Sequence, residues 1–171
     1  KKLAYADLLR YVGDPRFGAV PVASMLDKAR AASRAKLIDP SKAICQTTPD
    51  ELTSISAAKG NDTIYLTTVD RDGNIVSLIQ SNFEGFGSGI TVRGMGFALQ
   101  DRGALFSLNP ASPNVLVPRK RPFLTIIPAF MEKGDVHIGF GIMGGLNQTP
   151  AHAQFVSNVV DHGMSIQMAL E

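Results

Sequence analysis

The sequence has little of what marks several specialised classes of protein. It contains a single cysteine, Cys45, no tryptophan, and 17 Lys and Arg against 15 Asp and Glu. A lone cysteine excludes an intrachain disulfide and a thiolate metal cluster. A net charge of +2 is too small to indicate nucleic acid. No apolar run approaches the roughly 18 residues of a membrane-spanning helix. We therefore expect neither nucleic acid nor a membrane as a partner.

The start of the chain also lacks a secretory signal. The segment Lys1-Lys-Leu-Ala-Tyr-Ala-Asp7 has no apolar stretch after its basic residues. Together with the single cysteine, this favours the cytoplasm over the periplasm. A hydrophobic content of 44% and a charged content of 19% are those of an ordinary globular chain, and 171 residues suffice for one domain or part of one.

The spacing of apolar residues predicts helices at both ends of the chain and strands between them. Helices are expected over residues 4–12, 21–38 and 151–160, and from 165 to the chain end. Residues 41–62 are rich in Ser, Thr, Ala and Gly, which predicts an extended, mobile connection. This order of elements favours an α+β fold.

The turn Asp72-Gly73-Asn74 predicts a β-hairpin. It separates an alternating apolar run, which starts at Thr63, from a second apolar segment over residues 75–80. Further β segments are expected over residues 90–92, 96–99, 122–130 and 136–143.

One glycine motif suggests a function that we reject. Gly139-Phe-Gly141-Ile-Met-Gly144 matches the dinucleotide-binding pattern G-x-G-x-x-G after an expected strand. In that pattern the helix starts within the glycines, whereas Asn147-Gln-Thr-Pro150 should delay it here. We expect these glycines to serve close packing in a strand.

Other reactive residue types lack a supporting context. The three histidines, His137, His152 and His162, show no metal spacing and no paired acid, so we expect packing or capping roles. Ser88 does not lie in a Gly-x-Ser-x-Gly elbow, and nothing around Cys45 marks a nucleophile. We expect no metal and no cofactor.

A set of short motifs in a fixed order gives the chain a family resemblance. The motifs are Tyr5-Ala-Asp7 with Tyr11-Val-Gly-Asp-Pro15, Asp62-Thr63, Val69-Asp-Arg-Asp-Gly-Asn74, Ser81 with Phe86-Gly-Ser-Gly89, Lys120-Arg-Pro122 with Pro128, and Met143-Gly-Gly145. Together they resemble the γ-glutamyltranspeptidase (glutathione hydrolase) family of N-terminal-nucleophile hydrolases. The resemblance covers almost the whole chain.

The resemblance implies a four-layer αββα sandwich, present here as a fragment, and a proenzyme that cuts itself between Asp62 and Thr63. Residues 1–62 would end the large subunit and include the linker before the cut. Residues 63–171 would form the core of the small, catalytic subunit. The remainder of the large subunit would be a partner, and assembly into an oligomer stays open.

The chemistry of Thr63 fits this implication. A threonine hydroxyl needs a base to remove its proton, and a free α-amine with a pKa of about 7.7–8.0 can act as that base. In an intact chain the nitrogen of Thr63 is an amide, so cleavage would switch the activity on. The hydroxyl would then form an acyl-enzyme with the substrate.

The resemblance also assigns further site residues. Ser81 takes the place of a family threonine that hydrogen-bonds the nucleophile. Gly144 and Gly145 align with glycines whose N–H groups form the oxyanion hole. Thr125 falls where the family has a serine that holds the substrate's α-carboxylate. The alternatives are a strand serine, a turn glycine pair and a threonine at the edge of the core.

Departures from the family pattern bear on the substrate. The family grips the α-amino group with a glutamine and an acid, but Arg102 and Leu105 stand at those positions. An arginine repels an ammonium and offers a fork to a carboxylate. The family asparagine lines up with Phe83, and Asn82 is one place off. The chain therefore looks closer to the glutathione-hydrolase-like branch that includes oxamate amidohydrolase. Both γ-glutamyl compounds and a small acidic amide stay open as substrates, and transfer to amino acid acceptors is in doubt. Arg102 as a surface charge is the alternative.

Two other functions stay open from the sequence. One is a non-catalytic family member that keeps the fold as a scaffold or binding domain and never frees Thr63. The other is the dinucleotide binder, which predicts that NAD protects the protein against thermal unfolding, a result we do not expect.

Overall fold

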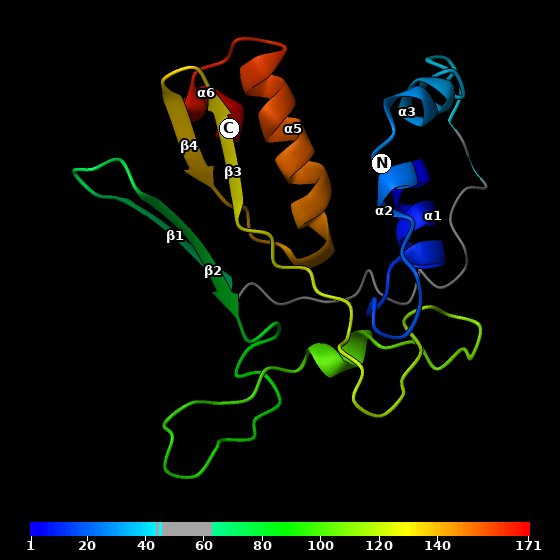
Figure 1. Ribbon diagram of the computed structural model, residues 1–171, viewed down its shortest axis with the longest axis vertical. Coiled ribbons are helices and arrows are strands. Elements are labelled where there is room, and N and C mark those ends of the chain that lie inside the picture. The colour runs from blue at the N-terminus through cyan, green and yellow to red at the C-terminus, as the bar shows by residue number, and fades with distance from the viewer. Residues whose placement is uncertain (44, 46–62) are drawn as a thin grey trace. The chain divides into compact units, whose positions relative to one another are not determined.

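The computed structural model describes residues 1–43, 45 and 63–171, in two compact units. The first unit contains Lys1–Ala57 and Arg102–Phe123, and the second contains Ala58–Asp101 and Leu124–Glu171. The helices, short 3₁₀ helices (η) and strands are labelled in Figure 1: α1 (Lys2–Tyr11), α2 (Val22–Met25), α3 (Lys28–Ala35), β1 (Thr63–Val69), β2 (Ile75–Ser81), η1 (Arg102–Leu105), β3 (Ala129–Lys133), β4 (Val136–Phe140), η2 (Gly145–Asn147), α5 (Gln148–Val160) and α6 (Ile166–Leu170). Most of the connection predicted over residues 41–62 lies outside the described residues.

The helices of the first unit differ from the prediction at one aspartate. α1 agrees with the helix expected over residues 4–12. The single helix expected over residues 21–38 is wrong, because it breaks into α2 and α3 at Asp27. The Asp27 carboxylate accepts hydrogen bonds from the N–H groups of Ala29 and Arg30. Such a cap stabilises a helix start by about 1 kcal/mol, so α3 begins where apolar spacing alone predicted a continuous helix.

Asp7 joins α1 to α3. Its carboxylate accepts hydrogen bonds from the guanidinium groups of Arg30 and Arg34, and the residue is buried. Burial of the carboxyl opposes ionisation, but hydrogen bonds from Arg34 and Arg30 outweigh it, so the pKa of Asp7 is lowered overall. The two helices are therefore held together by an ion-pair network.

Asp14 makes a second network in the first unit. Its side chain has no exposed surface. The carboxylate accepts hydrogen bonds from the Arg16 guanidinium and from the backbone N–H of Arg121. The Arg16 hydrogen bond holds the pKa of Asp14 well below its usual value. This aspartate therefore fixes the loop after α1 to a segment more than 100 residues later in the chain.

The second unit contains the predicted hairpin. β1 and β2 pair antiparallel, with Thr63 opposite Ser81 at the open end. At the closed end, the Asp70 carboxylate accepts hydrogen bonds from the N–H groups of Asp72 and Asn74. The short segments expected over residues 90–92 and 96–99 meet in a single antiparallel bridge.

The strand predicted over residues 122–130 is wrong in its first part. Strand pairing begins only at Ala129, where β3 starts its antiparallel ladder with β4. Pro122 and Pro128 have no N–H to donate. The N–H of Ile127 donates to the side-chain oxygen of Gln148 at 3.0 Å instead of to a strand. The apolar run is therefore fixed by α5 and not by a sheet.

The C-terminal helices follow the prediction with one shift. α5 begins at Gln148, three residues earlier than expected, directly after η2. Pro150 lies in its first turn, where a missing N–H costs no hydrogen bond. α6 starts after Ser165, whose hydroxyl accepts the N–H of Met168.

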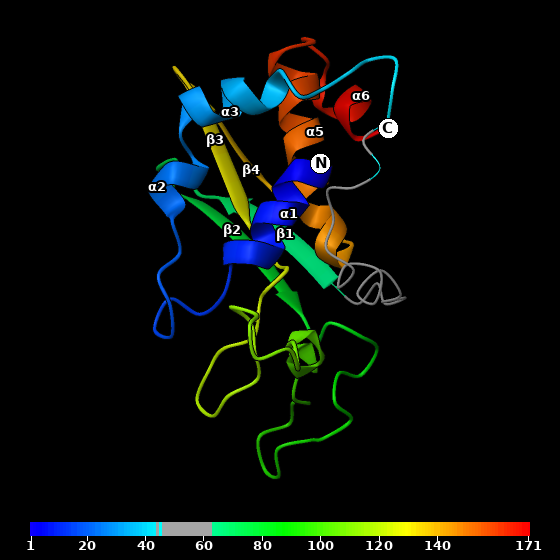
Figure 2. The same ribbon diagram turned by 90° about the vertical axis from the view of Figure 1, so that its right-hand side faces the viewer.

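The second unit is layered, with the β3–β4 hairpin between the β1–β2 hairpin and α5 (Figure 1). Figure 2 shows the two hairpins crossing. β4 packs against β1 and β2 on one face. On the other face, the ring centroid of Phe140 lies 4.9 Å from that of Phe155 and 5.4 Å from that of His152, both in α5. Two β layers and one helical layer agree with part of the predicted αββα sandwich. The outer face of the β1–β2 hairpin exposes Ile64, Leu66, Val76 and Leu78.

Candidate active site

Thr63 lies at the buried start of β1. Its residue surface is 7% exposed, and strand pairing places Ser81 directly opposite. The Thr63 hydroxyl donates a hydrogen bond to Ser81 Oγ at 3.0 Å. Opposite residues in an antiparallel pair point to the same face of the sheet, so the hairpin register itself brings the two hydroxyls together.

Ser81 Oγ accepts a second hydrogen bond, from the backbone N–H of Phe83 at 2.9 Å. Phe83 is buried and has a φ of 82°, a conformation uncommon for residues other than glycine. Asn82 is half-buried, and its carbonyl oxygen accepts the N–H of Asp101. The chain after β2 therefore turns back onto the Ser81 hydroxyl. This turn fixes the hydroxyl as the hydrogen-bond acceptor of Thr63.

Gly144 and Gly145 form the turn that enters η2 and α5. Their φ angles are 116° and 57°, in the region that favours glycine. The first N–H groups of a helix carry partial positive charge and attract anions. This turn can therefore present two donors to an oxyanion.

Thr125 and Gln148 are both buried in the second unit, with 3% and 1% of their surface exposed. The side-chain oxygen of Gln148 accepts the N–H of Ile127, and the backbone carbonyl oxygen of Gln148 lies 2.6 Å from Nδ1 of His152. Gln148 thus fixes the first turn of α5 to the segment that carries Thr125. Sequence reasoning missed Gln148, because one glutamine in a polar helix start gives no signal of burial.

Arg102 is the first residue of η1, in the first unit. Only 2% of its surface is exposed, so its interpretation as a surface charge is wrong. Leu105, at the other end of η1, is buried as well. A guanidinium withdrawn from solvent needs polar or anionic partners, which is the environment in which arginine binds carboxylates.

The other candidates from the sequence have structural roles. His137 does have a paired acid, contrary to the prediction: its Nδ1 lies 3.4 Å from Glu132, the residue opposite it in the β3–β4 hairpin. His152 packs against Phe140 as expected. Ser88 donates to the Leu99 carbonyl oxygen, and Cys45 is exposed.

The glycine motif of the rejected dinucleotide site packs closely against β1. The helix after it is not delayed to Ala151, so that part of the reasoning is wrong. A Cβ atom at Gly139 would lie 2.6 Å from Thr67 Oγ1, and one at Gly141 would overlap the Tyr65 ring. These two glycines are needed because strands approach closely here.

Two classes of site find no support in the part of the chain that the structure describes. No group of three or more His, Cys, Asp or Glu side chains could hold a metal ion there. None of its helices is long and apolar enough to cross a bilayer.

The hydrogen bonds that the structure describes at Thr63 and Ser81 join uncharged groups. A hydroxyl pair can orient an attacking oxygen but cannot take its proton at neutral pH, because neither hydroxyl is a base there. Asp62, the residue before the expected cut, lies outside the described residues.

Known proteins are similar to this chain in sequence and in fold. The family model Gamma-glutamyltranspeptidase matches residues 1–171. The glutathione hydrolase-like YwrD proenzyme of Bacillus subtilis is 35% identical over 170 residues, covering 99% of this chain and 31% of that protein. The oxamate amidohydrolase proenzyme of Klebsiella pneumoniae is 32% identical over 171 residues, with 99% and 31% covered. A solved gamma-glutamyltranspeptidase from Pseudomonas nitroreducens, complexed with L-DON, superposes with a TM-score of 0.55 at 28% identity, covering 61% of this chain and 60% of that chain.

Proposed function

Because this chain belongs to the gamma-glutamyltranspeptidase family, we propose that it carries the nucleophile of an amide hydrolase that activates itself by cutting its backbone before Thr63. The observation that carries the proposal is the 3.0 Å hydrogen bond between Thr63 and Ser81 at the buried start of β1. The chain spans 31% of the length of the two relatives described above. The activity is therefore assigned to the full-length protein that contains it.

Maturation needs one attack within the chain. Thr63 Oγ1 adds to the Asp62 carbonyl carbon, the C–N bond breaks, and the nitrogen takes the hydroxyl proton to become a free α-amine. Water then opens the ester, which leaves the Asp62 carboxylate and restores the Thr63 hydroxyl. Residues 1–62 become the end of the large subunit, and residues 63–171 become the core of the small subunit.

Turnover uses the amine that maturation creates. The α-amine of Thr63 accepts the hydroxyl proton as Oγ1 attacks the substrate's amide carbonyl, and this proton then leaves with the departing amine. Water hydrolyses the acyl ester. The negative charge on the tetrahedral oxygen is stabilised by the N–H groups of Gly144 and Gly145. The pH dependence of kcat/KM should rise through about 7.7–8.0, the range of a free α-amine.

The substrate class is a small amide that carries a carboxylate. By the family resemblance, Arg102 takes the position of a group that holds a substrate ammonium, and a guanidinium repels an ammonium and binds a carboxylate. Thr125 and Asn82 supply further polar groups to the substrate. No metal or cofactor is needed for these steps.

The cut itself is tested by the intact mass of the full-length protein after incubation. We expect two fragments whose junction is Asp62–Thr63, and a single unbroken species for Thr63→Ala. Thr68→Ala is the matched control, because Thr68 lies on the exposed face of the same strand. An unbroken wild type that behaves like Thr63→Ala would contradict the proposal and favour a non-catalytic scaffold.

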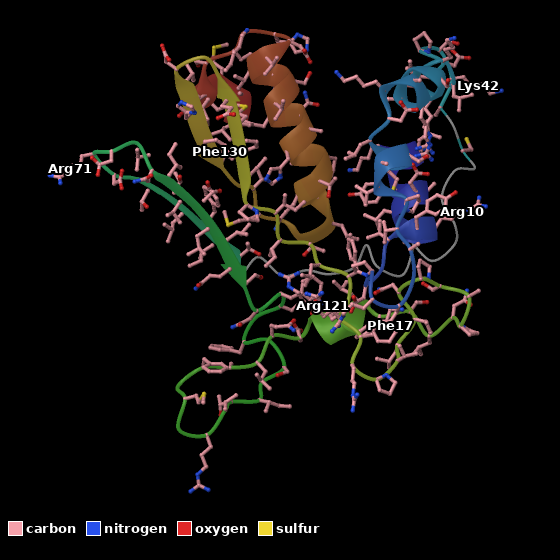
Figure 3. All side chains as sticks on the ribbon, viewed as in Figure 1. Arg10, Phe17, Lys42, Arg71, Arg121 and Phe130 are labelled. Carbon is pink, nitrogen blue, oxygen red and sulfur yellow. The ribbon has the colours of Figure 1, made fainter. Side chains whose placement is uncertain are left out.

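The substrate class is tested separately by comparing oxamate with γ-glutamyl-p-nitroanilide. Arg102→Gln should lower kcat/KM for oxamate by about ten- to a hundredfold, the scale of a lost charge-assisted hydrogen bond. Arg71→Gln is the control, since Arg71 lies at the tip of the β1–β2 hairpin with 93% of its side chain exposed (Figure 3). Unchanged oxamate turnover in Arg102→Gln would rule out this assignment.

A further inference from the structure

Gly141 lies against the ring of Tyr65. A Cβ atom at position 141 would lie 2.6 Å from Cε2 and 2.7 Å from Cγ of the ring, and closer still to Cδ2. A real Cβ atom essentially never lies closer than 3.0 Å to a neighbouring heavy atom of this kind. The backbone of Gly141 lies outside the left-handed region, so space alone excludes a larger residue.

The Tyr65 ring is held at both ends and cannot easily yield. One end is fixed by the backbone of β1, and the hydroxyl lies 2.9 Å from Ser77 Oγ. Ser77 Oγ in turn donates to the carbonyl oxygen of Ala129 at 3.0 Å. A methyl group at position 141 would therefore displace the backbone of residue 141 more readily than the ring.

Both partners of this contact lie close in sequence to the candidate site. Tyr65 is two residues after Thr63, so both side chains point to the same face of β1. Gly141 is three residues before Gly144. Figures 1 and 2 place the start of β1 and the segment that enters α5 at the same end of this unit. The contact is therefore a spacer between the strand of the nucleophile and the turn of the oxyanion donors.

We infer that the contact between Gly141 and Tyr65 is a positioning pair that sets the distance from the Thr63 hydroxyl to the N–H groups of Gly144 and Gly145. This inference rests on the proposed function of those groups. Gly141 and Tyr65 touch no reacting atom, and they act by holding the oxyanion turn in register with the nucleophile. A displacement of about 1 Å can cost up to about a hundredfold in rate.

The test is a double-mutant cycle in the full-length protein, with kcat measured for an amide substrate that the wild type turns over. Gly141→Ala should lower kcat by at least about tenfold, with a smaller change in KM. The same substitution in a Tyr65→Ala background should cost less than about twofold, because the ring that the methyl strikes is gone. In a Tyr65→Phe background the cost should lie between these two values, since the ring is kept but loses the contact with Ser77 that holds its far end.

Gly139→Ala is the control for a merely structural effect. Gly139 also faces β1, but its added methyl would strike the exposed side chain of Thr67 at 2.6 Å, whereas Ile75 and the Tyr65 hydroxyl lie farther away, at 3.3 and 3.4 Å. We expect a Tm loss like that of Gly141→Ala, without the loss in kcat. Equal kcat in Gly141→Ala and wild type, or an equal kcat cost in all three Tyr65 backgrounds, would overturn the inference. An uncut, inactive wild type would instead overturn the proposed function.

Discussion

The two units differ in the kind of polar group that they bury. Among the described residues, the buried polar side chains of the first unit are Asp7, Asp14 and Arg102, all charged types. Those of the second unit are the hydroxyl, amide and imidazole groups of Thr63, Thr125, Gln148 and His152. Ion pairs of Asp7 and Asp14 therefore join segments of the first unit, whereas in the second unit hydrogen bonds between uncharged groups join Thr63 to Ser81 and Gln148 to Ile127.

This difference shows where a base for Thr63 can come from. No carboxylate or lysine is buried among the described residues of the second unit, and the buried His152 ring contacts the Gln148 backbone carbonyl oxygen and Phe140. Ser81 is no base at neutral pH. In the proposed mechanism the α-amine released by cleavage supplies a base without any further side chain. Substitutions in the second unit should therefore change rates, and substitutions of the aspartates in the first should change stability and its pH dependence.

The largest loss of kcat without an additional loss of Tm is expected at Gly145. Gly145→Ala should lower kcat by about a hundredfold, because an alanine at a φ of 57° is strained by about 1–2 kcal/mol, which favours a backbone shift that moves the proposed oxyanion donors. Gly134→Ala is a matched control: φ is 56°, and an added Cβ meets nothing within 4 Å in either case. Both variants should lose similar Tm. If Gly134→Ala lost as much kcat, the oxyanion role of Gly145 would be excluded.

A smaller effect on rate is expected at Ser81. Ser81→Ala removes the acceptor of the Thr63 hydroxyl, and we expect self-cleavage and hydrolysis to slow by about tenfold, the scale of one oriented hydrogen bond. Ser81→Thr keeps the hydroxyl and should keep most of the activity. Rates for both variants follow from time courses of intact mass and of product release. Equal losses in the two variants would show that packing at this position matters, and not the hydroxyl.

The smallest effect on rate, and a clear one on stability, is expected at Asp14. Because its pKa in the folded protein lies well below the ordinary value of 3.8, this carboxylate stabilises the fold above that value. The stabilisation is lost as the pH falls through the lower folded pKa. Asp14→Asn should therefore lower Tm by several degrees at pH 7, with the difference shrinking towards pH 3, and should leave kcat nearly unchanged. A constant Tm difference across this pH range would contradict the ion-pair account.

Local signals in the sequence predicted much of the second unit. The Asp-Gly turn gave the β1–β2 hairpin, and its register alone brings Thr63 to Ser81. The alternating apolar residues Ile64 and Leu66, however, lie on the exposed face, while the buried start of the strand is the polar Thr63. Apolar alternation identifies a strand, but it does not identify which face packs within this part of the chain.

What the sequence did not predict depends on single long-range or capping contacts. Asp27 breaks one expected helix into two, and Gln148 takes the N–H of Ile127 and so prevents a strand. No pattern in the sequence indicated that Arg102 is buried, because the residue is the first of a short 3₁₀ helix. Such contacts depend on tertiary structure, which apolar spacing over a few residues does not record.

The central claim is that the Thr63 oxygen becomes the acyl acceptor once the chain is cut. The most direct measurement is peptide mapping by mass spectrometry of the full-length protein quenched during turnover of an amide substrate. The account predicts an acyl group on the peptide that begins with Thr63, linked as an ester that hydroxylamine removes. An acyl group on any other residue, or turnover by a protein whose Asp62–Thr63 bond stays intact, would contradict it.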